Sequence, residues 1–168
     1  MAVDLGDLIE NLQAEINPPG SNLFPDAVDD DWVTRLVNAF WDTVLDGLIT
    51  GYTESDGLVT PSSGTTELAR DLQQIVVFYA GIAVIRNAIR DINTQLRAKA
   101  GPVEFETAKS ANTLRDILKE LQQRRALLLN RLSDLGVTDS YYIDAIMARD
   151  ESYADSLTSW VSAHEGSA

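Results

Sequence analysis

Apolar residues recur at spacings of three and four over the stretch 66–100, which is the pattern of one face of an α-helix. The positions that make up this face are Leu68, Leu72, Ile75, Tyr79, Ile82, Ile85, Ile89, Ile92 and Leu96. Between Ile75 and Ile85 all eleven residues are non-polar, a run shorter than the ~20 apolar residues of a membrane span. We therefore expect a long central helix whose middle is covered on both sides.

A second apolar repeat occupies 102–135 and stops before Gly136. The dipeptide Gly101-Pro102 separates the two repeats, and glycine after one helix followed by proline at the start of the next is typical of a bend. The pattern predicts an antiparallel helical hairpin in which the numbers of facing residues sum to about 203. Gly81, in the middle of the first helix, predicts a close approach by another helix, for which the helix near residues 29–49 is the candidate.

This register predicts specific neighbours across the hairpin. Arginines over aromatic rings would form cation–π contacts of about 0.5–2 kcal/mol. The expected neighbours are Arg86 with Asp116, and Arg124 or Arg125 with Phe78 and Tyr79.

Two shorter amphipathic helices are predicted before the central one. Residues 4–16 carry one apolar stripe with Asp4 as the N-cap, and Asn17-Pro18-Pro19-Gly20 ends that helix. Asp29-Asp30-Asp31 suits the start of the next helix, where acids favour the positive end of the helix dipole. Its expected core face comprises Trp32, Leu36, Val37, Phe40, Trp41, Val44, Leu45, Leu48 and Ile49.

Residues 50–64 break the helical pattern and predict a small β-hairpin near 51–60. β-forming residues lie on both sides of Asp56-Gly57, and an Asp-Gly pair in that setting signals a tight turn. A two-stranded ribbon is marginal on its own, so it should lean on the bundle or on a neighbouring subunit. A mobile loop is the alternative.

Beyond Gly136 the pattern weakens into a C-terminal arm, 136–168. A short helix around Ile143 and Ile146 is expected, followed by an extended polar tail that would fray unless a partner chain holds it. The fold class is thus mainly α: a helical bundle on a long antiparallel hairpin (about 66–100 and 102–135). The core domain is 1–135 with the β-hairpin insert 50–64, and the arm follows.

Charge is distributed unevenly around a net value of −13. Residues 1–64 carry a net charge of −11, residues 65–135 carry +3 and residues 136–168 carry −5. A basic middle between acidic ends can dock like molecules head to tail, or the ends can fold onto the chain's own middle. Phosphate contacts need clustered lysine and arginine, so sequence-specific DNA binding is not expected.

No pattern of catalytic residues is present. The chain lacks cysteine, its one histidine is His164 near the end, and no phosphate-binding glycine loop occurs. The triple aspartate at 29–31 suits helix capping better than a cation site, because adjacent side chains do not converge. We expect a protein that is not an enzyme, without cofactor or metal. The start MAVDLGDLIE lacks a signal-peptide pattern, so synthesis in the cytoplasm is expected.

The order of these elements resembles the head-to-tail adaptor (connector) proteins of long-tailed bacteriophages. The resemblance covers about residues 4–135. It rests on the short first helix, the Trp/Phe-rich second helix, the hairpin at Asp56-Gly57 and the helical hairpin bent at Gly101-Pro102. The most family-like stretch is LARDLQQIVVFYAGIAVIRNAIRDINTQLRAKAGPVEFETAKSANTLRDILKELQQRR.

The resemblance implies a structural virion protein. Such adaptors form a ring, expected to be a dodecamer, beneath the portal protein; they extend the DNA channel and receive the next connector or tail protein. The C-terminal segment commonly grips the portal, and the anchors we propose here are Tyr141, Tyr142, Ile146, Tyr153 and Trp160. Candidate contacts to a neighbouring subunit or to the tail are Tyr52, Glu54, Asp56 and Leu58. Acidic residues along the channel would repel DNA and let it slide.

Two other functions stay open. The chain could be a helical-bundle binding module, such as a small chaperone or regulator, whose acidic ends mask a basic groove. It could also be an enzyme of unrecognised type, which would need a concave pocket with converging polar groups.

Overall fold

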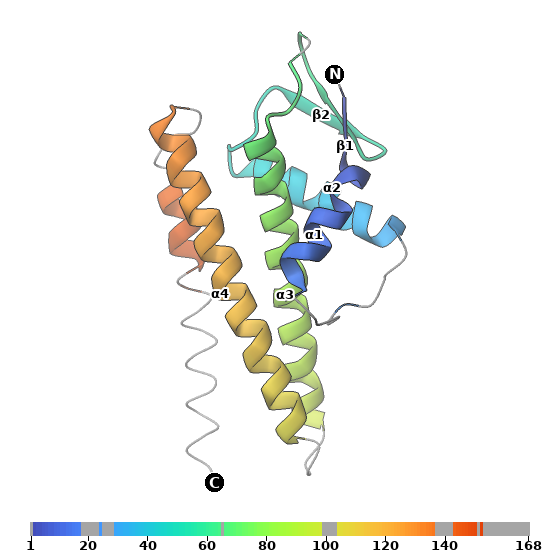
Figure 1. Cartoon of the computed structure of the whole chain (residues 1–168), viewed down its shortest axis with the longest axis vertical. Helices are drawn as coiled ribbons and strands as arrows, with labels where there is room; N and C mark the ends of the chain where they lie inside the picture. Colours follow the sequence, from blue (N-terminus) through green and yellow to red (C-terminus); the bar gives the residue numbers. More distant parts are fainter. Residues whose placement is uncertain are drawn as a thin grey trace.

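The computed structural model describes residues 2–17, 24, 29–64, 66–98, 104–136, 143–150 and 152. Helices make up most of it and one small sheet lies at one end, so the mainly α fold class is confirmed (Figure 1). The elements in chain order are β1 (Val3–Asp4), the 3-10 helix η1 (Leu5–Leu8), α1 (Ile9–Ile16), α2 (Asp29–Leu45), β2 (Tyr52–Ser55), β3 (Leu58–Pro61), α3 (Arg70–Ala98) and α4 (Glu104–Asp134). Residues 143–150 form a further helix.

Helix α3 lies at the centre, and α1, α2 and α4 all pack against it (Figure 1). Of the eleven residues from Ile75 to Ile85, all are buried except Ala83, which is exposed, so the apolar run predicts the burial at all the remaining positions. By length and composition alone the stretch Arg70–Ile92 could cross a membrane, with a mean hydropathy of 1.4, but 67% of it is buried inside the protein. The helices around it supply the apolar cover that a bilayer would otherwise provide.

Helices α3 and α4 run side by side in opposite directions (Figure 1). Arg124 lies 5.5 Å from the Phe78 ring and Arg125 lies 4.7 Å from the Tyr79 ring, so the expected cation–π contacts are confirmed. The ion pair that the structure shows for Arg86 is with Asp150, and its proximity to Asp116 stays a prediction. The bend at 99–103 lies outside the described residues.

Gly81 marks a close approach, but not by the helix expected. A Cβ at Gly81 would lie 3.3 Å from Ile16 Cγ2, 3.3 Å from Leu121 Cδ1 and 3.6 Å from Leu12 Cδ1. These side chains belong to α1 and α4, so the assignment to the helix near 29–49 is wrong. The short helix α1 fits closely against the middle of α3 because glycine there leaves room for its branched side chains.

The amino terminus adds a third strand that the sequence pattern does not predict. Val3 pairs with Val59 and Asp4 with Leu58, so the sheet has the order β1-β3-β2 and is antiparallel throughout. The Asp4 carboxylate accepts a hydrogen bond of 2.8 Å from the Gly6 amide, which confirms it as an N-cap, although the first turn is 3-10 rather than α. Two residues are too few for any periodicity to reveal a strand.

The predicted hairpin is present and leans on the bundle. Asp56 and Gly57 form its two-residue turn with positive φ values of 53° and 83°, the backbone that a type I′ turn requires. The Gly57 carbonyl accepts from the Leu5 amide at 2.9 Å, and a Cβ at Gly57 would lie 3.2 Å from Val33. Strand β1 and helix α2 therefore supply the support that a two-stranded ribbon lacks.

Helix α2 ends earlier than predicted, at Leu45. Gly47 has a φ of 73° and its amide donates to the Val44 carbonyl, while the Leu48 amide donates to the Thr43 carbonyl. This pair of bonds is the Schellman motif that reverses the chain at a glycine. Leu48 therefore lies beyond the helix, as does Ile49, although both remain buried.

The core face of α2 is also narrower than predicted. Trp32 and Phe40 are buried, as expected, but Trp41 is 41% exposed and Leu45 is 82% exposed. Trp41 instead donates its indole N–H to Glu54 of β2 at 3.0 Å. Its amphipathic ring thus joins the helix to the hairpin while one edge stays in water.

We predict that Gly81→Val lowers the free energy of unfolding by about 1–3 kcal/mol, because its methyl groups would overpack against Ile16 and Leu121. Valine is no worse than glycine in helix propensity, so the loss would report packing. Ala83→Val, on an exposed position of the same helix, is the control and should cost about 0.5 kcal/mol. Urea denaturation measures both, and a Gly81→Val protein as stable as the parent would contradict the close fit.

Candidate functional site

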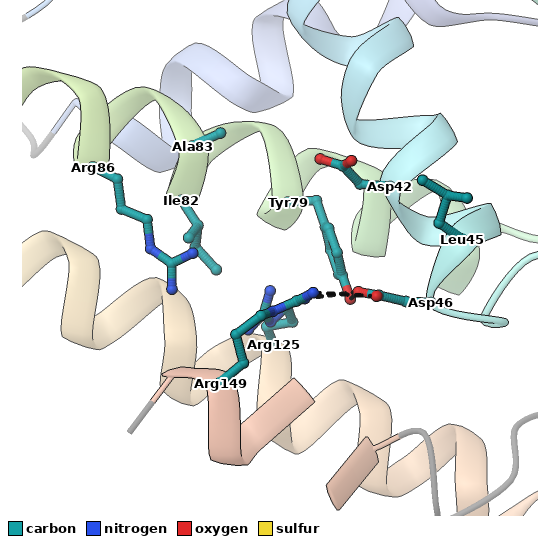
Figure 2. A pocket seen from close by; sticks show the side chains of 9 residues that line it. All are labelled: Asp42, Leu45, Asp46, Tyr79, Ile82, Ala83, Arg86, Arg125 and Arg149. Carbon is teal, nitrogen blue, oxygen red and sulfur yellow. Dashed lines mark hydrogen bonds and ion pairs between the residues drawn. The ribbon is translucent and has the colours of Figure 1, made fainter. Parts of the chain in front are cut away.

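A cleft of about 290 Å³ lies between α2, α3, α4 and the helix 143–150. Charged side chains reach it from each of these elements (Figure 2). On α3, the residues Tyr79, Ile82, Ala83 and Arg86 are spaced so that one helix face lines the cleft. The complete lining is Asp42, Leu45, Asp46, Tyr79, Ile82, Ala83, Arg86, Arg125 and Arg149.

Asp46 anchors one side of the cleft. Its carboxylate accepts hydrogen bonds from the Tyr79 hydroxyl at 2.6 Å and from both terminal nitrogens of Arg149, at 2.7 and 3.2 Å (Figure 2). A two-pronged arginine–carboxylate pair is stronger and better oriented than a single contact. Asp46 directly follows the last residue of α2, where the negative end of the helix dipole also favours Arg149.

Asp150 anchors the other side. Its two oxygens accept from Arg86, at 2.9 Å, and from Arg125. The Arg125 side chain is only 3% exposed and the Asp150 side chain 14%, and the Arg125 guanidinium lies over the Tyr79 ring. A buried guanidinium is costly without a carboxylate. The neighbouring residues Arg149 and Asp150 thus attach the helix 143–150 to α2, α3 and α4 together.

Burial and the neighbouring charged groups shift the pKa values of the two aspartates, Asp42 and Asp46, in opposite directions. Burial, and then the nearby charge of Asp46, raises the pKa of Asp42 above its ordinary value of 3.8, against the opposing effect of Arg149. Burial would also raise the pKa of Asp46, but hydrogen bonds from Arg149 and Tyr79 outweigh it and lower that pKa. Burial, followed by the bond to Asp46, raises the pKa of the Tyr79 hydroxyl.

The arginines of the cleft pair with aspartates of the same chain. We call the ion pairs Arg86–Asp150, Arg125–Asp150 and Arg149–Asp46 the clasp. Arg86, Arg125 and Arg149 are balanced in formal charge by Asp42, Asp46 and Asp150, and each arginine bonds to an aspartate. Within the described portion of the chain, no group of three or more His, Asp or Glu side chains is placed to hold a metal ion. The geometry serves to fasten four helices to one another.

The residues predicted at the hairpin surface divide into two pairs. Glu54 forms hydrogen bonds within its own chain, since its carboxylate accepts from the Trp41 indole N–H and, at 2.8 Å, from the Gly57 amide. The Tyr52 hydroxyl donates to the Glu67 carbonyl at 3.3 Å. Asp56 and Leu58 are exposed, so this pair remains available for the predicted contact.

Of the residues predicted to bind the portal, Ile146 is the one within the described chain. It is 3% exposed and belongs to the hydrophobic core, together with Ile143. In this structure Ile146 therefore packs on its own bundle, and a contact with another protein would require the helix 143–150 to leave it. Residues outside the described chain are Tyr141, Tyr142, Tyr153 and Trp160.

Sequence reasoning found Arg125 beside Tyr79 but missed the clasp. One signal was present: Arg125 occupies a core position between Leu121 and Leu132, both buried, where the repeat calls for an apolar residue. A charged residue at such a position predicts a buried partner of opposite charge. Nothing in the sequence pattern identifies that partner as Asp150, because residues 137–142 carry no apolar repeat that would set the position of the following helix.

We predict opposite outcomes for two aspartates one helical turn apart. Asp46→Asn should lower the free energy of unfolding at neutral pH by about 1–2 kcal/mol, because it removes the charge that Arg149 and Tyr79 bind. Asp42→Asn should leave stability unchanged or slightly higher, because the folded state disfavours a charge at that position. Urea denaturation at pH 7 compares the two, and equal losses would refute the assignment.

The same pair predicts the pH dependence. Because the pKa of Asp46 is lowered on folding, its stabilisation is fully present above the unfolded value of about 3.8 and is lost as the pH falls through the folded value. The pKa of Asp42 is raised on folding, so protonation of Asp42 favours the folded state as the pH falls. Asp42→Asn should therefore not reduce the loss of stability in acid. Unfolding free energies between pH 7 and 3 should therefore vary less steeply for Asp46→Asn than for the parent protein. An unchanged slope would contradict the role of Asp46.

Comparison with protein-family models, with curated proteins and with solved structures found no match. Inference about function therefore rests on the geometry above and on the order of elements along the chain.

Proposed function

We propose that this protein is a head-to-tail adaptor of a long-tailed bacteriophage. On this proposal it is a structural subunit without catalytic activity. It forms a ring, of dodecameric symmetry, beneath the portal protein in the virion, extends the DNA channel and receives the next connector or tail protein. DNA passes through the ring without sequence-specific contacts.

The observation that carries the proposal is the order of elements. A short amino-terminal helix, an aromatic helix α2, a hairpin at Asp56-Gly57 and two long helices follow one another in the chain, as they do in the family that the sequence resembles. We propose that α3 and α4 are the arms of the long hairpin over 66–100 and 102–135. At ~1.5 Å per residue such arms extend roughly 50 Å, a length suited to packing side by side around a ring.

The charge distribution supports the same proposal. The strongly acidic segment 1–64 and the basic segment 65–135 offer unlike faces, and unlike faces allow the heterologous contacts from which closed rings are built. Asp56 and Leu58 are exposed, and the hairpin that carries them lies at one end of the molecule (Figure 1). We propose that this end meets a neighbouring subunit or the tail.

We predict that the full-length protein co-sediments with purified portal rings of its own phage and adds a layer of matching symmetry, visible by negative-stain electron microscopy. Trp160→Ala should reduce the bound fraction several-fold, because aromatic anchors contribute most to such interfaces. Leu127→Ala removes an exposed apolar side chain of α4 (70% exposed) and serves as the matched control. It should bind like the parent protein.

Two results would overturn the proposal. One is a protein that stays monomeric with portal rings at concentrations well above those found in infected cells. The other is binding that Trp160→Ala and Leu127→Ala weaken equally, which would indicate non-specific adhesion. Because rings can require the portal to assemble, a monomer in isolation agrees with the proposal.

A further inference from the structure

The helix 143–150 meets the bundle through a single, regular face. Ile143 and Ile146 are each 3% exposed, and Asp150 follows at a spacing that keeps it on the same side of the helix. Asp144, by contrast, is exposed. The face that docks therefore has the pattern Ile-x-x-Ile-x-x-x-Asp, with two apolar anchors and one carboxylate, and Arg149 beside it bonds to Asp46.

The surface that receives this face belongs to other elements of the chain. Arg86 comes from α3 and Arg125 from α4, and both bond to the Asp150 carboxylate. Arg125 is held independently of that bond, because its guanidinium lies 4.7 Å from the Tyr79 ring and the Tyr79 hydroxyl is bonded to Asp46. The receiving site is thus preorganised for a carboxylate, and its buried guanidinium requires one.

We propose that Arg86 and Arg125, with the apolar surface beside them, form a docking site for a helix of this pattern. The chain's own segment fills the site here, and the same segment of a second copy can fill it in trans. The fit is demonstrated by the segment itself. Charge favours docking of this segment in cis and in trans alike, since residues 136–168 carry a net −5 and residues 65–135 a net +3. Exchange of one element between identical chains creates no new interface chemistry.

The inference does not depend on the adaptor proposal. It would hold for any protein with this structure, and failure to bind portal rings would leave it intact. Conversely, a docking site that accepts no second segment would leave the ring proposal untouched. The two proposals are therefore tested separately.

The test uses the full-length chain with its own segment disabled by Ile146→Asn and Asp150→Asn, which leaves Arg86 and Arg125 in place. The probe is a fluorescent peptide of residues 141–152, YYIDAIMARDES, and binding is followed by anisotropy. The peptide should bind this variant at least about tenfold more tightly than the parent protein, in which the site is occupied. A peptide carrying Asp150→Asn should bind at least about tenfold more weakly, whereas an Asp144→Asn peptide should bind like the unmodified one.

A second measurement guards against a variant that fails to fold. The chain contains no cysteine, so Ile146→Cys introduces one buried thiol whose labelling rate reports release of the helix. Adding Asp150→Asn should speed labelling at least about tenfold, and adding Asp144→Asn should not change it. Unchanged labelling with Asp150→Asn would overturn the carboxylate site. Docking in trans would be overturned if the Asp150→Asn peptide bound as tightly as the unmodified peptide. It would also be overturned if the peptide did not bind a folded Ile146→Asn, Asp150→Asn protein.

Discussion

The structure depends on burying the apolar middle of one helix, α3, against the helices around it. Because α3 carries eleven consecutive non-polar residues in its middle, burial of a single stripe would leave apolar surface in water, at a cost of roughly 25 cal/mol for each Å². Helices α1, α2 and α4 all pack against it. Gly81 allows α1 and α4 to pack close to α3. Because glycine has no side chain, Leu12 and Ile16 of α1 and Leu121 of α4 can approach its backbone.

A second constraint follows from placing a charge inside this core. Arg125 lies where the repeat of α4 would otherwise put leucine, and its side chain is 3% exposed. The Arg125 guanidinium makes a cation–π contact with the Tyr79 ring, but its buried charge also needs a carboxylate partner. Asp150 supplies it, and Arg149 then reaches Asp46 beyond the end of α2. One buried arginine thereby explains why the carboxy-terminal helix belongs to the bundle.

These two constraints bear differently on function. The apolar cover of α3 holds α1, α2 and α4 against one central helix. In the charged cleft, two arginines, Arg86 and Arg125, bind one carboxylate, that of Asp150, in a defined geometry. A protein that joins others can use such a site to keep an arm closed until a matching segment is offered. The same cleft also makes the stability of the protein sensitive to pH through Asp46.

The sequence by itself determined the elements whose signals are local. The helical repeats, the cap at Asp4, the Asp56-Gly57 turn and the stop at Gly136 follow from periodicity and backbone preference within a few residues, and even the Arg125–Tyr79 contact follows from the spacing of two regular helices. Only the tertiary structure decided the strand at Val3, the partner of Gly81 and the pairing of Arg125 with Asp150. Those contacts join segments far apart in the chain, and no short-range pattern encodes which segments meet. Packing around the buried helix selected them.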